Sequence, residues 1–231
     1  MFDSIAPAYD FMNRAMTLGI DRRWRRTALD MISDRPHDDI LDIATGTADL
    51  AILMAKVLDP VSVTGIDLSE QMLAKGRLKV TEEELDDTVR LMAGDCLQLP
   101  FPDETFDLVT SAFGVRNFEN LLAGYREMYR VLRPGGTVCV IELSTPPSGV
   151  VRPFYHLYTR HIIPTIGRAV SSDRRAYSYL PESIAAVPQG QDMLDLMARA
   201  GFTDCRFRRL TLGVCTVYTA VKKPEDGELK I

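Results

Sequence analysis

Short apolar runs alternate with helix-like segments over residues 40–143, and few folds accommodate that alternation. The first run, residues 40–44 (Ile-Leu-Asp-Ile-Ala), is bounded by turn residues, as buried strands usually are. Strands that alternate with helices predict a parallel sheet covered by helices on both faces. The expected strands are 40–44, 61–66, 89–93, 106–112 and 137–143, and the expected helices are Asp49–Leu58, Ser69–Lys79 and Asn120–Leu132, the last stopped by Pro134-Gly135-Gly136.

The alternation breaks after residue 143. Residues 144–189 are rich in proline and aromatic side chains and predict an inserted lid rather than more sheet. Gln191–Ala200 has a helical pattern, and residues 203–209 and 211–221 alternate like two strands joined by a short turn. The expected fold is therefore α/β and Rossmann-like, with a seven-stranded, mostly parallel sheet that ends in an antiparallel hairpin.

Composition and length indicate one domain. Hydrophobic residues make up 46% of the chain and charged residues 26%, which is typical of a folded globular protein. A chain of 231 residues suits a single α/β domain. We expect one domain over residues 1–223, with an N-terminal helical lid at 1–30 and a substrate lid at 144–189, followed by a disordered tail at 224–231.

Charge, cysteine content and hydropathy narrow the classes of function. The net charge of −5 disfavours nucleic acid as a partner, because phosphate contacts need clustered Lys and Arg. The four cysteines form no C-x-x-C pair, so we expect reduced thiols and no metal. With no signal peptide and no apolar run of about 18 residues, we expect a cytoplasmic protein. A local cluster of Arg22, Arg23, Arg25 and Arg26 is interpreted as the polar face of an early helix.

The turn after the first strand indicates a nucleoside site. Its small residues, Ala44 and Gly46, let the backbone approach a ligand closely. Ligands of open α/β sheets bind outside the carboxyl ends of the strands. Asp67 ends the second strand about 20 residues after Thr47, where a carboxylate can accept hydrogen bonds from ribose hydroxyls.

The acidic residues around this turn favour S-adenosylmethionine over a dinucleotide. The third small position of the dinucleotide fingerprint falls on Asp49, which would repel a pyrophosphate at the start of the helix. The ammonium and sulfonium of S-adenosylmethionine are positive and suit Asp42 and Asp49. A tight turn without a ligand is the alternative for the loop alone.

Asp95 and Cys96 follow the third strand, at the same edge of the sheet. An acidic side chain there could bond the adenine amino group, and the thiol could pack on the ring. The alternative for Asp95 is a turn or cap residue. Three such sites at successive strand ends are difficult to explain without a nucleoside ligand.

Several further segments resemble a known family. The segments Asp42-x-Ala-x-Gly-x-Ala, Gly65-Ile66-Asp67, Gly94-Asp95 and Leu132-Arg133-Pro134-Gly135-Gly136 are similar to the ordered motifs of class I S-adenosylmethionine-dependent methyltransferases. More specific segments are Met1-Phe2-Asp3-Ser4-Ile5-Ala6-Pro7-Ala8-Tyr9-Asp10, Phe113-Gly114-Val115-Arg116-Asn117-Phe118 and Tyr179-Leu180-Pro181-Glu182-Ser183-Ile184. Together they resemble the ubiquinone/menaquinone biosynthesis C-methyltransferases from residue 1 to about residue 223.

The resemblance implies methyl transfer from S-adenosylmethionine to a ring carbon of demethylmenaquinol, giving menaquinol. A benzoquinol precursor of ubiquinone or another small aromatic remains an alternative acceptor. It implies cofactor contacts at Thr47, at Asp67 with Leu68, and at Asp95 with Cys96. Family members often carry a serine where this chain has Ala112, so a hydroxyl contact there is absent.

The acceptor side of the site is expected at Arg116 and Asn117, which follow the fourth strand. A hydroquinone becomes more nucleophilic when one hydroxyl loses its proton, so the site needs a base or a stabilising cation. Arg116 would supply the positive charge, although a structural salt bridge is its alternative role. Asp10 and Tyr179 are candidate bases or clamps, as are Tyr9 and His156.

Three alternative hypotheses remain: a methyltransferase of another acceptor, a NAD-dependent oxidoreductase, and a quinone-binding protein with an inactive cofactor site. Residues 152–168 mix aromatics, aliphatics and arginines, which suits a lid that admits an isoprenoid tail or touches the membrane surface. Ordinary core packing is the alternative for that stretch. The expected partners are a lipid quinol, the membrane surface and a second copy of the chain.

Overall fold

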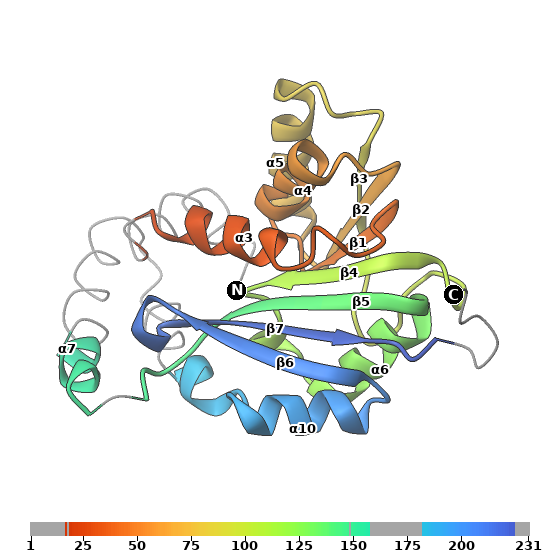
Figure 1. Cartoon of the computed structure of the whole chain (residues 1–231). Helices are drawn as coiled ribbons and strands as arrows, with labels where there is room; N and C mark the ends of the chain where they lie inside the picture. The colour runs from red at the N-terminus through yellow and green to blue at the C-terminus, as the bar shows by residue number, and fades with distance from the viewer. Residues whose placement is uncertain (1–16, 18, 148, 158–181, 225–231) are drawn as a thin grey trace.

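The computed structural model describes Thr17, residues 19–147, residues 149–157 and residues 182–224 (Figure 1). Two of the expected site residues, Asp10 and Tyr179, lie outside these ranges, as do Tyr9 and most of residues 152–168. The expected N-terminal lid and substrate lid lie only partly within these ranges.

A single seven-stranded sheet forms the centre of the molecule, in the order β3-β2-β1-β4-β5-β7-β6 (Figure 1). The first five strands pair in parallel, and β7 runs antiparallel to both β5 and β6. The prediction of a mostly parallel sheet with a C-terminal antiparallel hairpin is confirmed. The strands are β1 (Asp39–Ile43), β2 (Ser62–Asp67), β3 (Val89–Ala93), β4 (Phe106–Ala112), β5 (Leu132–Leu143), β6 (Thr203–Leu210) and β7 (Cys215–Val221).

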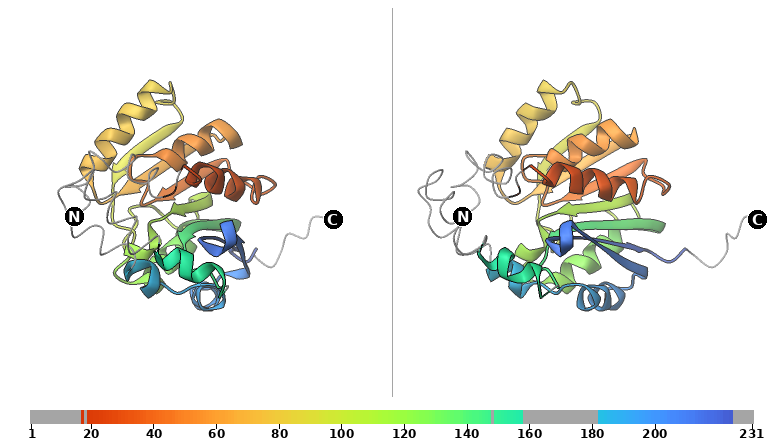
Figure 2. Two further views of the ribbon diagram at one scale, coloured as in Figure 1. Left: turned by 90° about the vertical axis from the view of Figure 1, so that its left-hand side faces the viewer. Right: turned by 60° about the vertical axis from the view of Figure 1, so that its left-hand side comes forward.

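Helices cover both faces of the sheet (Figures 1 and 2). One hydrophobic cluster joins the sheet to the helices of the N-terminal half and includes Trp24, Leu29 and Met54. A second cluster on the other face includes Tyr125 and Met197. The helices are α3 (Asp21–Asp30), α4 (Asp49–Leu58), α5 (Glu70–Glu82), α6 (Leu121–Val131), α7 (Val151–Leu157) and α10 (Gln191–Arg199), with short 3-10 turns η2 (Val115–Asn117) and η4 (Thr211–Gly213).

Two helix starts follow directly from the sequence. The hydroxyl of Ser69 accepts a hydrogen bond from the backbone N–H of Met72 at 3.3 Å, and the amide oxygen of Asn120 accepts one from Ala123 at 3.0 Å. Such caps satisfy backbone donors that have no partner inside the helix. Both helices therefore begin one residue after the cap, at the carboxyl edge of the sheet.

The start of β5 corrects one expectation. The strand was expected at residue 137 and begins at Leu132, which pairs with Phe106. The Pro-Gly-Gly segment is drawn into the sheet because Gly135 donates its N–H to Lys222 and Gly136 accepts from Lys222, each at 2.9 Å. Helix α6 ends at Val131, before the Pro-Gly-Gly segment rather than at it.

The last strand also begins later than expected. Residues 211–213 form the turn η4 instead of strand, and Leu212 there has a φ of 57°. A left-handed residue interrupts a strand because its backbone cannot continue the extended ladder. The hairpin strand β7 therefore begins at Cys215.

Arg25 lies on the buried face of α3, which corrects the interpretation of the arginine cluster. Arg22, Arg23 and Arg26 are exposed as expected, whereas Arg25 is only 7% exposed, beside buried Trp24.

The described part of the chain contains no helix long and apolar enough to span a membrane. Its four cysteines are free thiols, with Cys139 and Cys215 buried.

Candidate functional site

A cavity of about 320 Å³ opens at the carboxyl ends of β1, β2, β3 and β4. This is the edge at which an open α/β sheet binds ligands. Its size falls within the usual range for small-molecule sites, about 300–1,000 Å³. Its walls are Ala44, Gly46, Ile66, Asp67, Leu68, Met72, Gly94, Asp95, Cys96, Leu97, Phe113, Gly114, Asn117, Phe118 and Glu119.

The turn after β1 forms one wall and has an unusual backbone. Ala44, Gly46 and Ala48 all have positive φ, at 55°, 57° and 65°. Left-handed residues other than glycine are uncommon and need support from their surroundings. Part of that support is a hydrogen bond from the N–H of Thr45 to the carbonyl of Ile66 at 2.9 Å, which ties the turn to the end of β2.

The carboxylate of Asp42 stabilises this turn through hydrogen bonds. Its two carboxylate oxygens accept bonds from the hydroxyls of Thr45 and Thr110, each at 2.7 Å. The side chain is 1% exposed, and this burial raises the pKa of Asp42 to about 6. Asp42 lines a smaller recess beside the turn and not the main cavity, and its two hydroxyl contacts stabilise the turn.

Asp67 stands at the end of β2 and faces the cavity. Its carboxylate accepts hydrogen bonds from the backbone N–H groups of Gly46 and Ser69, each at 2.9 Å. These two bonds fix the plane of the carboxylate between the turn and the start of α5. A carboxylate offers about four acceptor positions, so a carboxylate oriented in this way can bond a ligand as well as the backbone.

The segment after β3 forms the next wall. The Asp95 carboxylate accepts a hydrogen bond from the N–H of Leu97 at 2.9 Å. The Asp95 backbone also forms an isolated antiparallel β-bridge with Gln98, as in a tight turn. Burial, together with the nearby charge of Asp95, raises the pKa of the Cys96 thiol to about 12. Cys96 is therefore a neutral thiol that can pack against an apolar ring.

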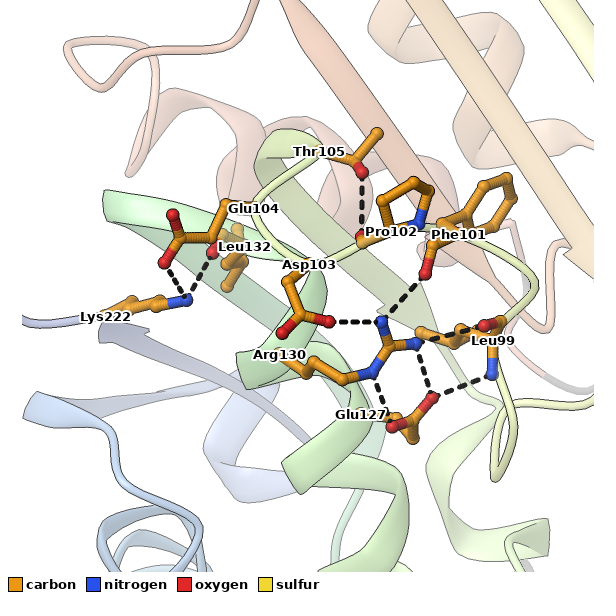
Figure 3. A network of polar contacts seen from close by, with 10 residues as sticks. All are labelled: Leu99, Phe101, Pro102, Asp103, Glu104, Thr105, Glu127, Arg130, Leu132 and Lys222. Carbon is orange, nitrogen blue, oxygen red and sulfur yellow. Dashed lines mark hydrogen bonds and ion pairs between the residues drawn. The ribbon is translucent and has the colours of Figure 1, made fainter.

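A network around Arg130 holds this wall in place (Figure 3). The guanidinium donates to the carbonyls of Leu99 and Phe101 at 3.0 and 2.8 Å and is paired with Asp103 and Glu127. Glu127 in turn accepts the N–H of Leu99 at 2.8 Å. Helix α6 thus fixes the chain that leads from Cys96 to β4.

The fourth wall comes from the segment after β4, where the acceptor was expected. Asn117 lines the cavity. Arg116 does not line it and pairs with Glu142 of β5, Nη1 to Oε1 at 2.7 Å, with side-chain exposures of 10% and 2%. Glu142 also accepts the backbone N–H of Arg116 at 3.2 Å, and the guanidinium bonds the carbonyl of Phe113. Arg116 is thus a near-neighbour of the cavity that is held by a buried carboxylate.

The expected site residues divide into groups. Those on the main cavity are Ala44, Gly46, Asp67, Leu68, Asp95, Cys96 and Asn117. Those on the smaller recess are Asp42, Thr47 and Ala112, together with Ala44 and Gly46. Arg116 lines neither space, and Asp10 and Tyr179 are outside the described residues.

Arg25 also lines the smaller recess, and the sequence interpretation missed it. The signal was present in the spacing of the helix. Asp21, Trp24, Arg25, Ala28 and Leu29 follow the i, i+3, i+4, i+7, i+8 pattern of one helix face, and all five are buried. An arginine within such a stripe must be buried with its partner, whereas the neighbouring arginines fall outside the stripe.

Gly65 on β2 permits the close approach of the turn, and its replacement tests this packing. A Cβ at Gly65 would lie 2.6 Å from the Leu91 side chain and 2.9 Å from the side chain of Thr45. We expect Gly65→Ala to lower the free energy of unfolding by about 1–3 kcal/mol, as overpacked cores usually do. Gly149→Ala is the matched control, because no atom of the described residues lies within 4 Å of a Cβ built there. Equal urea midpoints for the two variants would contradict this account.

The chain has the class I methyltransferase fold. Its strands follow the order 3-2-1-4-5-7-6. The small-residue turn after β1 and the acid at the end of β2 lie together at one edge of this sheet. A methyltransferase from Aquifex aeolicus described as SAM-dependent has the same fold, with a TM-score of 0.63 over 86% of this chain and 89% of that one, at 18% identity.

Comparison with known sequences defines the family. The profile of the ubiE/COQ5 methyltransferase family matches residues 1–222, so the chain belongs to that family. A demethylmenaquinone methyltransferase from Bacteroides fragilis is 47% identical over 96% of this chain and 91% of the relative. A ubiquinone/menaquinone biosynthesis C-methyltransferase from Geotalea daltonii is 43% identical over 96% of this chain and 94% of the relative.

The residues present fit S-adenosylmethionine. Asp67 can accept bonds from a ribose, and the uncharged Cys96 with Leu97 can flank an adenine. The described walls of the main cavity contain three acids, Asp67, Asp95 and Glu119, and no lysine or arginine, which suits a cation rather than a pyrophosphate.

Proposed function

We propose that the chain transfers a methyl group from S-adenosylmethionine to a ring carbon of demethylmenaquinol, giving menaquinol. The observation that carries the proposal is the cavity itself, in which three strand ends present Gly46, Asp67 and Asp95 to one space. Membership of the family and the names of its relatives supply the acceptor class. When bound, S-adenosylmethionine supplies an electrophilic methyl group on a positively charged sulfur.

The cofactor half of the site would bind and orient S-adenosylmethionine. Asp67 accepts the ribose hydroxyls, with its carboxylate already oriented by Gly46 and Ser69. Asp95 bonds the adenine amino group while Cys96 packs on the ring. Orientation is the main requirement of this reaction, because holding two reactants in line removes much of the entropic barrier to their encounter.

The acceptor half must hold a quinol oxygen as it loses its proton. Asn117 reaches the cavity from η2 and donates its side-chain N–H to that oxygen. Arg116, fixed by Glu142 immediately behind, supplies positive charge as the oxyanion develops. Asp10 and Tyr179 remain the proposed bases or clamps, with Tyr9 and His156 as further candidates.

We also propose that the lipid acceptor is reached at the membrane surface. Val150 and Leu157, beside and within α7, and Leu212, in the turn between β6 and β7, are exposed apolar side chains. Helix α7 and the turn between β6 and β7 both lie on the left-hand side of the molecule in Figure 1. Apolar side chains of this kind can enter the headgroup region of a bilayer. Sedimentation with lipid vesicles tests the contact. That the chain forms a homodimer remains a prediction from the sequence alone.

Calorimetric titration tests the proposed function. We expect micromolar binding of S-adenosylmethionine and no detectable binding of NAD, because Asp49 begins α4 where a pyrophosphate would need a helix N-terminus without nearby negative charge. Purified enzyme should then methylate demethylmenaquinol faster than a benzoquinol precursor. Binding of NAD alone would refute the proposal, and cofactor binding without turnover of any quinol would leave an inactive quinone-binding protein.

A further inference from the structure

A recess of about 20 Å³ is lined by the turn that follows β1. It is large enough for about one water molecule or one small polar group. Ala44 and Gly46 line both this recess and the main cavity, so the two spaces adjoin the same turn. A ligand whose ribose is bound at Asp67 can extend its remaining chain past this turn into the recess.

Arg25 is the cation of the recess, and its environment is built for a charged group. Its side chain is 8% exposed and pairs through Nη1 with Asp21, which is 3% exposed. Burial opposes ionisation of Asp21, but the Arg25 charge prevails and holds the pKa of that carboxyl below its usual value. The Phe113 ring covers the guanidinium, with its centroid 5.3 Å from Cζ.

The guanidinium has donors left over after these contacts. Asp21 takes Nη1, while Nε is buried and has no hydrogen-bond partner among the described residues. A guanidinium carries five N–H donors, and its paired edges match a carboxylate. A buried donor without a partner is costly, so a second acceptor at this position would stabilise the site.

The other charges of the recess are acidic. Asp42 and Asp49 both line it. Asp49 is paired with Lys79 at 2.8 Å, and Lys79 also donates to Thr47 at 2.9 Å. Lys79 itself does not line the recess, which leaves Arg25 as the cation that faces it within the described chain. One cation beside two acids matches a zwitterion, with a carboxylate at Arg25 and an ammonium at the acids.

We infer that Arg25 binds the carboxylate of the amino-acid end of S-adenosylmethionine, while Asp42 and Asp49 face its ammonium group. The inference rests on the proposed function and adds the group that selects this end of the cofactor. Asp21 is the positioning residue, because it holds the guanidinium on the Phe113 ring and balances its charge.

Three ligands that cannot be turned over separate the parts of this contact. S-adenosylhomocysteine carries the carboxylate and the ammonium, its decarboxylated counterpart carries only the ammonium, and 5′-methylthioadenosine carries neither. By calorimetry we expect the unaltered protein to prefer the first over the second by about tenfold to a hundredfold, as for hydrogen bonds to charged groups. Arg25→Met should remove this preference while leaving the affinity for the other two ligands within about twofold.

Two further variants serve as a control and as a replacement in case Arg25→Met does not fold. Arg26→Met removes the next arginine of α3, whose side chain is 58% exposed, and should leave all three affinities unchanged. If Arg25→Met does not fold, because Asp21 is left unpaired, the double variant Asp21→Asn, Arg25→Met removes both charges and is measured instead. An unaltered carboxylate preference in the variant that folds, or an equal loss for all three ligands, would overturn the inference. Failure of the unaltered protein to bind any of the three would instead refute the proposed function.

Discussion

Arg116→Met is expected to lower kcat by about a hundredfold to a thousandfold, while the affinity for S-adenosylhomocysteine changes little. The proposed role of Arg116 is to supply charge as the quinol oxygen becomes an anion, and removal of one such group has an effect of that size in other enzymes. Cofactor affinity should survive because Arg116 lines neither the main cavity nor the recess. Single-turnover kinetics with demethylmenaquinol and calorimetry with the product cofactor measure the two quantities.

The pair with Glu142 makes a control essential. Removing Arg116 alone leaves Glu142 buried without its cation, and breaking a buried pair costs about 3–5 kcal/mol of stability. The double variant Arg116→Met, Glu142→Gln removes both charges, and its glutamine can still accept one of the backbone N–H groups that Glu142 accepts from Arg116 and Leu143. We expect the double variant to regain most of the urea midpoint but none of the turnover. Recovery of turnover together with stability would show that Arg116 has only a structural role.

The elements that the sequence predicts well are those whose signals are local. Apolar runs marked the five parallel strands, and an alternating pattern marked the last two. Ser69 and Asn120 marked the starts of two helices, and the structure contains a cap at each. The early start of β5 depends on something else. Gly135 and Gly136 join the sheet because Lys222, far along the chain, pairs with them, and no local pattern reports that pairing.

The residues of the site also differ in whether the local sequence predicts their positions. Gly46, Asp67 and Asp95 could be predicted because parallel strands bring successive carboxyl ends to one edge, whatever the details of packing. The partnership of Arg116 with Glu142 joins a turn to a strand 26 residues away and has no local signature. Arg25 falls between these cases, since its helical spacing indicated burial although the charge of its neighbours suggested a solvated face.

Asp67→Ala should weaken the binding of S-adenosylhomocysteine by about 1–3 kcal/mol, or about fivefold to 150-fold. The carboxylate is the acceptor proposed for the ribose hydroxyls, and its loss leaves those donors without this partner in the cavity. The same change also frees the N–H groups of Gly46 and Ser69, so part of the effect would come from a looser turn. The affinity alone therefore does not identify the contact.

A ligand that lacks the ribose 2′-hydroxyl separates these two contributions. The unaltered protein should prefer the complete ribose, whereas Asp67→Ala should bind both ligands with similar affinity, because only the lost contact distinguishes them. Glu70→Ala removes a nearby acid whose side chain is 63% exposed and paired with Arg77, and it should keep the full preference. If Asp67→Ala still discriminates between the two ligands, the carboxylate orders the turn but does not bind the ribose, and the hydroxyl must be held by another group.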